Sequence, residues 1–328
     1  MVVDGAIVQE FQRKGFLIVK GIFSDDEVGD LREHLFRTRL AGHYPGDYVS
    51  TDERGNDPLK QYPRLLHPHR WDEKTRSWLL DDRLRLILTE LMGDEPYAAQ
   101  TMVYFKPPGG RGTALHQDQY YLRVHPGTCV AAWIALDDTD EENGCMTVVP
   151  GSQAFPLLCV VEADLDVSAT PITVPLPEDV QPVALPMQAG DVLFFAGQLI
   201  HGSLPNTSSN RFRPALACHY VVAEAEQVTQ IDRPVLRFDG SEVELDASPT
   251  GGECGVWVDE HDERRIEVSG EDPRNPAYER ILEEMNAEIW EQTRALKEQL
   301  QSGERVMYKK DFNAEFREDY KKNSPKSA

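Results

Sequence analysis

The spacing of apolar residues predicts a helix, a strand and a second helix within the first forty residues of the chain. The first helix ends at Gly15, and the apolar run at 16–19 that follows is typical of a short strand. Ser24 and Glu27 stand three positions apart, as they do in a capping box, so we expect the second helix to begin there and to run to about Arg39. The chain therefore begins with a mixed segment rather than with a row of strands.

Residues 41–63 are rich in Gly, Asp and Pro, which predicts a loop that could fold over a site as a flap. A helix is expected over Leu79–Met92, because apolar residues recur there every three or four positions and Gly93 follows. Just before this helix lies a basic and aromatic group that either reaches an anionic substrate or is simply a polar loop. Its members are Arg64, His67, His69, Arg70 and Trp71.

From Ala98 onwards the pattern changes to short apolar runs broken by Pro and Gly. Several short strands with turn residues between them indicate a sandwich or a jelly roll. The expected strands are 98–105, 113–121, 129–136, 145–149, 183–187, 191–196 and 215–222.

The last third of the chain is different in character. Residues 223–272 are acidic and contain two hairpin-like pieces, which predicts a β elaboration at the rim of the main fold. Residues 273–302 carry an apolar stripe at helical spacing, which either packs on the protein's own sheet, the favoured alternative, or forms the seam of a homodimer. Residues 303–328 are a polar tail. We expect one domain over 1–328, with its core at about 8–222.

The chain has a formal charge of −22, which argues against nucleic acid and anionic membranes as partners, because both require an excess of Lys and Arg. A small-molecule substrate remains compatible with this charge, since a site can be locally positive on an acidic protein. With 40% hydrophobic and 27% charged residues, the composition is that of an ordinary globular protein.

The five cysteines are odd in number, scattered, and form no CxxC pair. We therefore expect free thiols in a reducing compartment rather than a disulfide framework or a zinc site. No signal peptide is evident at the N-terminus, and no uncharged apolar run approaches the roughly 18 residues of a membrane span. The expected location is cytoplasmic.

The most informative chemistry lies in the sequence His116-Gln117-Asp118. If this segment is a strand, His116 and Asp118 point to the same face and Gln117 points away. An imidazole beside a carboxylate is two thirds of the facial triad that holds Fe(II) and leaves open positions for substrate chemistry. The third ligand should be a histidine distant in sequence.

The best candidate for that ligand is His201, which follows the apolar strand 190–195 and is followed by Gly202 and Ser203. Most of the remaining histidines have ordinary explanations: His34 lies on a helix, His219 lies in a strand expected to be buried, and the polar loops contain His43, His125 and His261. About ten residues after His201, Arg211 and Arg213 offer a guanidinium that could bind the carboxylate of a diacid co-substrate.

Taken in order, these motifs resemble those of the phytanoyl-CoA dioxygenase family of Fe(II)/2-oxoglutarate oxygenases. The resemblance covers roughly residues 8–222 and implies a mainly β fold with flanking helices, the cupin-like double-stranded β-helix, a form of jelly roll. The matching segments are 15–19, 104–108, 116–118, 132–137, 143–145, 149–152, 201–203, 212–215 and 218–220.

The resemblance also implies roles for single residues. His116, Asp118 and His201 match the catalytic iron ligands. Arg213 matches the residue that pairs with the distal carboxylate of 2-oxoglutarate, although the spacing leaves Arg211 open.

Four further residues are expected near 2-oxoglutarate. Ser203 matches a hydroxyl that binds the same carboxylate, and Trp133 matches a ring that lines the pocket, unless it is ordinary core. Gln100 and Lys106 lie on the strand that enters the site and could touch co-substrate or substrate, although Lys106 could equally be a solvated strand end.

The implied reaction uses Fe(II), 2-oxoglutarate and O2 to oxidise a C–H bond of a small metabolite or biosynthetic intermediate, with release of succinate and CO2. Hydroxylation is favoured over halogenation because Asp118 occupies the position that halogenases leave open for chloride. Desaturation and ring formation are alternatives on the same fold, and a non-catalytic, metal-binding sensor is the alternative from another class. Substrate contacts are expected from the loops at 41–75, 119–127, 155–180 and 224–260, including Tyr120 and Tyr121.

Overall fold

The computed structural model describes residues 5–42, 44, 47–48, 57–249, 252–260 and 263–269, together with 291, 294–296 and 298. Most of the expected C-terminal helix, with its apolar stripe and dimer seam, and the whole polar tail lie outside these residues. About half of the expected flap at 41–63 is described, and this part is not wholly a loop, because it contains a short strand at Asp47–Tyr48 and a short helix at Pro58–Gln61. Where the C-terminal segment is described it is helical, and Leu296 is buried.

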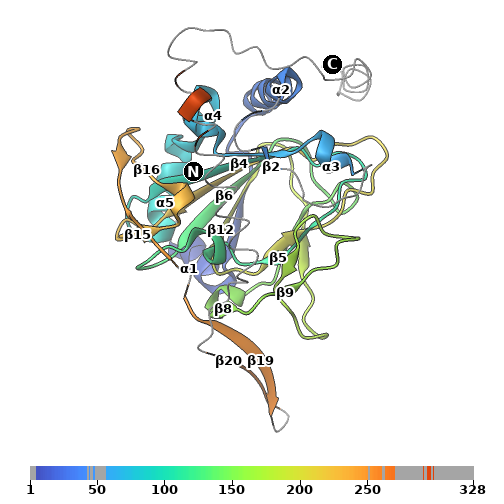
Figure 1. The fold of residues 1–328 in the computed structure, drawn as a ribbon, viewed down its shortest axis with the longest axis vertical. Coiled ribbons are helices and arrows are strands. Elements are labelled where there is room, and N and C mark those ends of the chain that lie inside the picture. Colours follow the sequence, from blue (N-terminus) through green and yellow to red (C-terminus); the bar gives the residue numbers. More distant parts are fainter. Residues whose placement is uncertain are drawn as a thin grey trace.

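Two antiparallel sheets form the body of the molecule (Figure 1). The large sheet is built from β1 (Phe16–Val19), β12 (Val192–Ala196), β6 (Cys129–Ala135), β14 (Ala215–Val221), β4 (Tyr97–Tyr104), β16 (Val235–Leu236) and β17 (Glu242–Val243), in that order, with β3 (Arg64–Leu66) beside β4 and β2 (Asp47–Tyr48) beside β3. The small sheet has the order β11 (Val183–Leu185), β7 (Met146–Val148), β13 (His201–Ser203) and β5 (Thr113–His116). The predicted jelly roll is confirmed.

Alternation along the strands of the large sheet separates its two faces. On the outer face, Ile134, Phe194 and Leu216 join the main hydrophobic core beneath the helices. On the inner face, Trp133 and Phe195 face the small sheet and form a second core. The functional cavity opens on this inner side.

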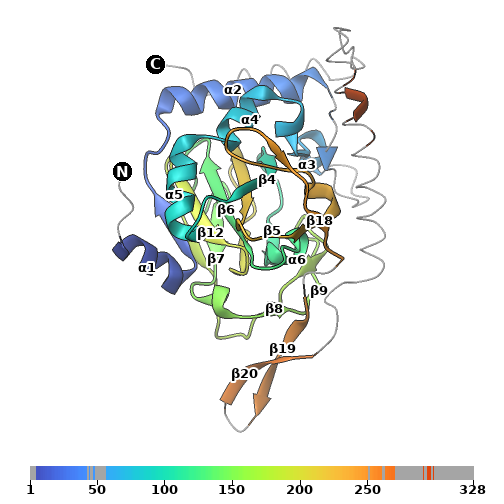
Figure 2. The ribbon, with the colours of Figure 1, turned by 90° about the vertical axis from the view of Figure 1, so that its left-hand side faces the viewer.

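Helices cover the outer face of the large sheet (Figure 2). The helices on this face are α1 (Gly5–Lys14), α2 (Asp25–Ala41), α4 (Glu73–Leu79) and α5 (Asp82–Met92). Two further short helices are α3 (Pro58–Gln61) and α6 (Gln119–Leu122), and α6 lines the inner cavity. The opening helix–strand–helix order was predicted correctly. The helix predicted over 79–92 begins three residues later, because the Asp81 carboxylate accepts a hydrogen bond from the Arg83 backbone N–H and caps it there. Among the described residues, no helix is both long and apolar enough to cross a membrane.

The capping box of α2 is present: the Ser24 hydroxyl accepts from the Glu27 backbone N–H at 3.4 Å, and the Glu27 carboxylate accepts from the Ser24 N–H at 2.9 Å. We expect Ser24→Ala to lower the free energy of unfolding by about 1 kcal/mol, because an N-cap hydroxyl satisfies an otherwise unpaired backbone donor. Urea denaturation measures this change. Ser209→Ala, at an exposed loop position, is the matched control, and an equal loss in both variants would contradict the capping role.

The predicted strand 113–121 is wrong in its second half. Strand β5 ends at His116, and the chain turns at Asp118, which has helical backbone angles of φ −61° and ψ −30° and precedes α6. His116 and Asp118 therefore share a face because of this turn and not because of strand alternation. The prediction failed because a four-residue helix leaves no periodic signal in the sequence.

The prediction that all five cysteines are free is also wrong. Cys159 and Cys254 form a disulfide, while Cys129, Cys145 and Cys218 are free and buried. The pair is 95 residues apart in sequence, so no spacing motif indicated it. It forms because β19 (Cys254–Glu260) runs parallel to β8 (Leu157–Leu158), which brings the two Cα atoms to 4.9 Å.

The acidic region after the core contains the two predicted hairpins. One is β16–β17, which extends the large sheet, and the other is β19 with β20 (Glu263–Val268), which projects from the body at the bottom of Figure 1. The remaining short strands are β9 (Val161–Glu162), β10 (Ile172–Thr173), β15 (Gln227–Val228) and β18 (Asp246–Ala247). Because β16 pairs with β4, this region closes one side of the cavity described next.

Candidate active site

A cavity of about 420 Å³ lies between the two sheets. Its floor is the inner face of the large sheet, which presents Gln100, Met102 and Tyr104 from β4 and Trp133 from β6. Its roof comes from the small sheet and the turn after β5. The other lining residues are Arg64, Leu66, Thr113, His116, Asp118, Tyr121, Leu122, Arg123, Met146, Thr170, Phe195, His201, Gly202, Ser203, Arg213, Ala217, His219, Thr229, Gln230, Ile231, Ala247, Ser248 and Pro249.

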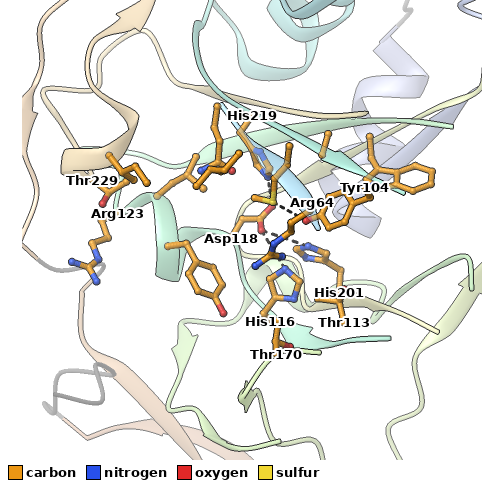
Figure 3. Close-up of a pocket in the computed structure, with 18 of the residues that line it drawn as sticks. Arg64, Tyr104, Thr113, His116, Asp118, Arg123, Thr170, His201, His219 and Thr229 are labelled. Carbon is orange, nitrogen blue, oxygen red and sulfur yellow. Dashed lines mark hydrogen bonds and ion pairs between the residues drawn. The ribbon is translucent and has the colours of Figure 1, made fainter. Parts of the chain in front are cut away.

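His116, Asp118 and His201 converge in the wall of this cavity (Figure 3). Strand β13 pairs with β5 so that His201 lies directly opposite His116. The Nε2 atom of each histidine lies 3.5 Å from Oδ1 of Asp118, and one ligand atom from each residue falls within 4.8 Å of the others. Two imidazole nitrogens and one carboxylate oxygen on one side of an open cavity are the donor set of a facial triad.

The tautomers of the two histidines fit a metal site. Nδ1 of His116 lies 2.8 Å from the Ala114 carbonyl oxygen, and Nδ1 of His201 lies 2.9 Å from that of Leu199. A carbonyl can only accept, so each Nδ1 carries the proton and each Nε2 presents a lone pair toward Asp118. Burial, followed by the neighbouring His116, lowers the pKa of His201 to about 4, which keeps this imidazole neutral.

Gln117, between the two ligands, fixes the turn that carries them. Its amide Nε2 donates to the carbonyl oxygens of Pro156 and Gln198, and its Oε1 accepts from the backbone N–H of Leu158 at 2.8 Å. All three bonds cross to other segments of the chain. The outward-facing residue of the motif is therefore the one that anchors it.

His219 was assigned to the core from the sequence, yet it touches the site. Its Nε2 lies 3.0 Å from Oδ2 of Asp118, the oxygen that faces away from the other two histidines. Burial alone would raise the pKa of Asp118, but His201 and His219 hold it well below its usual value. The missed signal was strand alternation: on β14, His219 shares a face with Ala217, which lines the cavity.

We expect His219→Leu to weaken Fe(II) binding by about 10- to 100-fold, because partners that orient a ligating carboxylate carry effects of that size. Equilibrium dialysis of Fe(II) under anaerobic conditions measures it. His219→Gln, which keeps a donor for the Asp118 carboxylate, should lose much less. Equal affinity in His219→Leu and the unmodified protein would show that this contact does not support the metal site.

Beyond the triad, two buried cations form what we call the cationic end of the site, made by Lys106 and Arg213. Nζ of Lys106 donates to Ser203 Oγ at 2.7 Å and also to the Leu204 carbonyl oxygen. The Arg213 guanidinium donates from Nε to the Gly144 carbonyl oxygen at 3.1 Å and lies 5.2 Å from the centroid of the Trp133 ring. Ser203, Trp133 and Arg213 thus line one end of the cavity, with Lys106 directly behind Ser203.

The electrostatics of the cationic end favour the binding of an anion. Burial lowers the pKa of Arg213 to about 10, and burial together with Arg213 lowers that of Lys106 well below its ordinary value. Within the part of the chain that the structure describes, no carboxylate pairs with either cation, and Nη1 of Arg213 is buried without a hydrogen-bond partner. A carboxylate of a small molecule would supply the missing acceptor.

Arg211, the alternative to Arg213, lies outside the cavity. Its Nη1 pairs with Asp140 at 2.6 Å and with Glu142 at 3.5 Å on the surface. The geometry therefore favours Arg213 as the cation that reaches the site.

The basic and aromatic group before α4 is divided by the fold. Arg64 lines the cavity and points toward the triad (Figure 3). The other members are structural: His69 bonds to Thr101, and Arg70 donates to the Ile231 carbonyl oxygen at 2.7 Å. Of the two tyrosines after the turn, Tyr121 lines the cavity, whereas Tyr120 packs in a separate cluster.

Comparison with known proteins agrees with this geometry. The family described as "Phytanoyl-CoA dioxygenase (PhyH)" matches residues 11–215. Among curated relatives, the peroxisomal phytanoyl-CoA dioxygenase of Homo sapiens is 32% identical over 66% of this chain and 68% of its own length. That of Rattus norvegicus is 28% identical over 67% of this chain and 68% of its own.

Solved structures share the fold. The carbocyclase SnoK from nogalamycin biosynthesis is 24% identical, with a TM-score of 0.53 over 68% of this chain and 85% of its own. The epimerase SnoN from the same biosynthesis, solved with Fe3+, alpha ketoglutarate and nogalamycin RO, is 22% identical, with a TM-score of 0.55 over 68% of this chain and 86% of its own. At these identities the likeness extends to the fold and not to the substrate.

Proposed function

Because the chain belongs to the phytanoyl-CoA dioxygenase family, whose members use iron, 2-oxoglutarate and dioxygen, we propose that it hydroxylates an unactivated C–H bond of a small-molecule substrate. The balanced reaction takes up substrate, 2-oxoglutarate and O2 and releases hydroxylated substrate, succinate and CO2. The observation that carries the proposal is the convergence of His116, Asp118 and His201 in the wall of a cavity whose end is cationic.

The three converging side chains would hold the iron through the two Nε2 atoms and a carboxylate oxygen. Each histidine is kept in the correct tautomer by a backbone carbonyl, and Asp118 is kept ionised and oriented by His219. When bound, the iron supplies the oxidising chemistry that couples decarboxylation of 2-oxoglutarate to attack on the substrate C–H bond.

The cationic end would hold the distal carboxylate of 2-oxoglutarate. Arg213 offers its unpartnered Nη1, and Ser203 offers a hydroxyl that Lys106 already orients. Because both cations are buried, their attraction for a carboxylate is screened less than it would be at the surface. Trp133 lies against the guanidinium and limits the width of this end of the cavity.

The apolar part of the cavity would protect the reaction from water. Met102, Phe195 and Ala217 line the floor between the cationic end and the opposite end. An apolar wall of this kind excludes water and so limits side reactions while the substrate is in place. Gln100, which the sequence placed near co-substrate or substrate, lies at the far end of the same floor.

Anaerobic addition of Fe(II) and 2-oxoglutarate to the purified protein tests the proposal. We expect the weak visible charge-transfer band of an iron–2-oxoglutarate chelate, followed by succinate formation when air is admitted with a substrate. Iron binding without the band would instead favour a metal-binding sensor. The mass of the product separates hydroxylation, a gain of one oxygen, from desaturation or ring formation, each a loss of two hydrogens.

A further inference from the structure

The cavity has two ends of different origin. Tyr104 and Thr113 lie on one side of the triad, and Thr229 and Arg123 lie on the other (Figure 3). The cationic end belongs to the first side, because the Arg213 guanidinium lies 5.8 Å from the centroid of the Tyr104 ring and Ser203 pairs with Thr113. The second side is built largely by residues beyond the matched family segment, among them Thr229, Ile231 and Ser248. With the cationic end assigned to 2-oxoglutarate, this second end is where the substrate would lie.

One polar contact joins this end to the core of the large sheet. The amide Nε2 of Gln100, on β4, donates to Oδ1 of Asp232 at 3.0 Å. Asp232 is fully buried and belongs to the same 3-10 turn, Gln230–Asp232, whose first two residues line the cavity. A side chain from the elaboration thus reaches back to a residue in the floor of the site.

Gln100 lies close to the triad. In the register of β14 and β4, it stands directly opposite His219, which contacts Asp118 at 3.0 Å. Residues opposite each other in an antiparallel pair have Cβ atoms about 5 Å apart and point to the same face. The Gln100 side chain is therefore next to His219, which in turn contacts the Asp118 carboxylate that would hold the metal.

The contact with Asp232 determines which end of the Gln100 amide faces the cavity. A carboxylate can only accept a hydrogen bond, so the NH2 group of Gln100 must face Asp232, and its carbonyl Oε1 is left to face the cavity. Burial raises the pKa of Asp232 to about 6, with Gln100 and Arg70 acting in the opposite direction. The Nε2 atom of His67 lies 3.3 Å from the same Asp232 oxygen.

Oε1 of Gln100 accepts no hydrogen bond from any residue that the structure describes, while Gln100 lines the cavity. This oxygen faces the open cavity, and a ligand that covers it without donating a hydrogen bond would leave a buried acceptor unpaired, which is costly. The ligand that fits is one that brings a donor to this point.

Resting on the proposed function, we propose that Asp232 is a positioning residue that aims the Gln100 carbonyl at the substrate, and that the substrate carries a hydroxyl or N–H donor near the carbon that is oxidised. The same end of the cavity is bounded by apolar side chains such as Leu122 and Ile231 and by the polar side chains of Thr229 and Ser248. The substrate class is therefore a compact molecule that has both apolar parts and a donor group, and not a plain hydrocarbon chain.

Isomeric probes test this inference on the protein loaded with Fe(II) and 2-oxoglutarate under anaerobic conditions. Octanol is compared with its isomer methoxyheptane, and cyclohexylmethanol with its isomer methoxycyclohexane, by isothermal titration calorimetry. We expect each alcohol to bind at least about tenfold more tightly than its ether isomer, the factor typical of one paired buried acceptor. In Gln100→Leu the ratio of the two dissociation constants should fall to about one.

Variants of Asp232 separate positioning from a merely structural role. Asp232→Leu should abolish the alcohol preference, and adding Gln100→Leu should cause no further loss, since both changes remove one interaction. Asp232→Asn keeps an acceptor for the Gln100 amide and should preserve the preference. Glu226→Gln, an exposed change in the same region, is the control.

Each outcome decides the matter. Equal affinities within the isomer pairs, or no measurable binding of either isomer, overturn the donor-bearing substrate class, and an unchanged preference in Asp232→Leu overturns the positioning role. If Asp232→Leu does not fold, side-chain amide NMR of Gln100 in the unmodified protein decides instead: slow exchange of its Nε2 protons supports the contact and fast exchange contradicts it. Absence of the charge-transfer band in the unmodified protein would refute the proposed function itself, whereas a band without alcohol preference refutes this inference alone.

Discussion

His201→Ala is expected to abolish the charge-transfer band and to lower succinate formation by at least about a thousandfold, because removal of one of three protein ligands leaves the metal poorly held and misoriented. The fold should survive. His201 begins a short strand of the small sheet, and its backbone hydrogen bonds to β5 and β7 do not depend on the imidazole. The circular dichroism spectrum and the urea midpoint check this point.

The matched control is His125→Ala, a histidine in the loop before β6 that does not line the cavity. It should retain both the band and turnover. Full turnover in His201→Ala, with iron still bound, would remove His201 from the ligand set and would require another group to complete it.

Arg213→Leu should have the second largest effect: an increase in the 2-oxoglutarate concentration needed for half-saturation by about 100-fold. Truncation of one partner of a buried, hydrogen-bonded charge pair costs about 2–5 kcal/mol, which corresponds to about 30-fold or more in affinity. Iron binding should be unaffected, because Arg213 does not contact the triad in the described structure. Succinate assays over a range of 2-oxoglutarate concentrations measure the change.

Arg211→Leu is the control for this experiment, since the two arginines are two positions apart in sequence but only Arg213 reaches the cavity. Its ion pairs are partly exposed and should contribute little to binding or stability. A large effect in Arg211→Leu together with a small one in Arg213→Leu would reverse the assignment of the carboxylate partner.

The sequence was sufficient for the parts of the fold that are periodic. The short strands of the jelly roll and the capping box at Ser24 carry local signals, because alternation and capping depend on residues close together in the chain. The turn after His116 carries no such signal, and neither does the Cys159–Cys254 pairing, which depends on two strands 95 residues apart.

For the site, the sequence located the three converging residues and the two candidate arginines but not their surroundings. The choice between Arg211 and Arg213 required the structure, because both residues fit the expected spacing after His201 and only their burial distinguishes them. His219 and Asp232 were not foreseen at all. Each acts through one contact with a residue from a different segment, Asp118 and Gln100 respectively, and such contacts leave no trace in local spacing.

The cavity is walled on its two sides by different stretches of chain. The metal-facing wall and the cationic end come from residues up to His219, whereas the opposite wall combines residues 121–123 with residues 229–231 and 247–249. Several contacts join residues 229–249 to the rest of the cavity, among them Gln100 with Asp232, the Thr229 N–H with the Leu122 carbonyl oxygen, and Arg123 with the Pro249 carbonyl oxygen. Exchange of residues 229–249 between relatives, with these contacts kept, would therefore give chimaeras that share one oxidation chemistry and differ in what they oxidise.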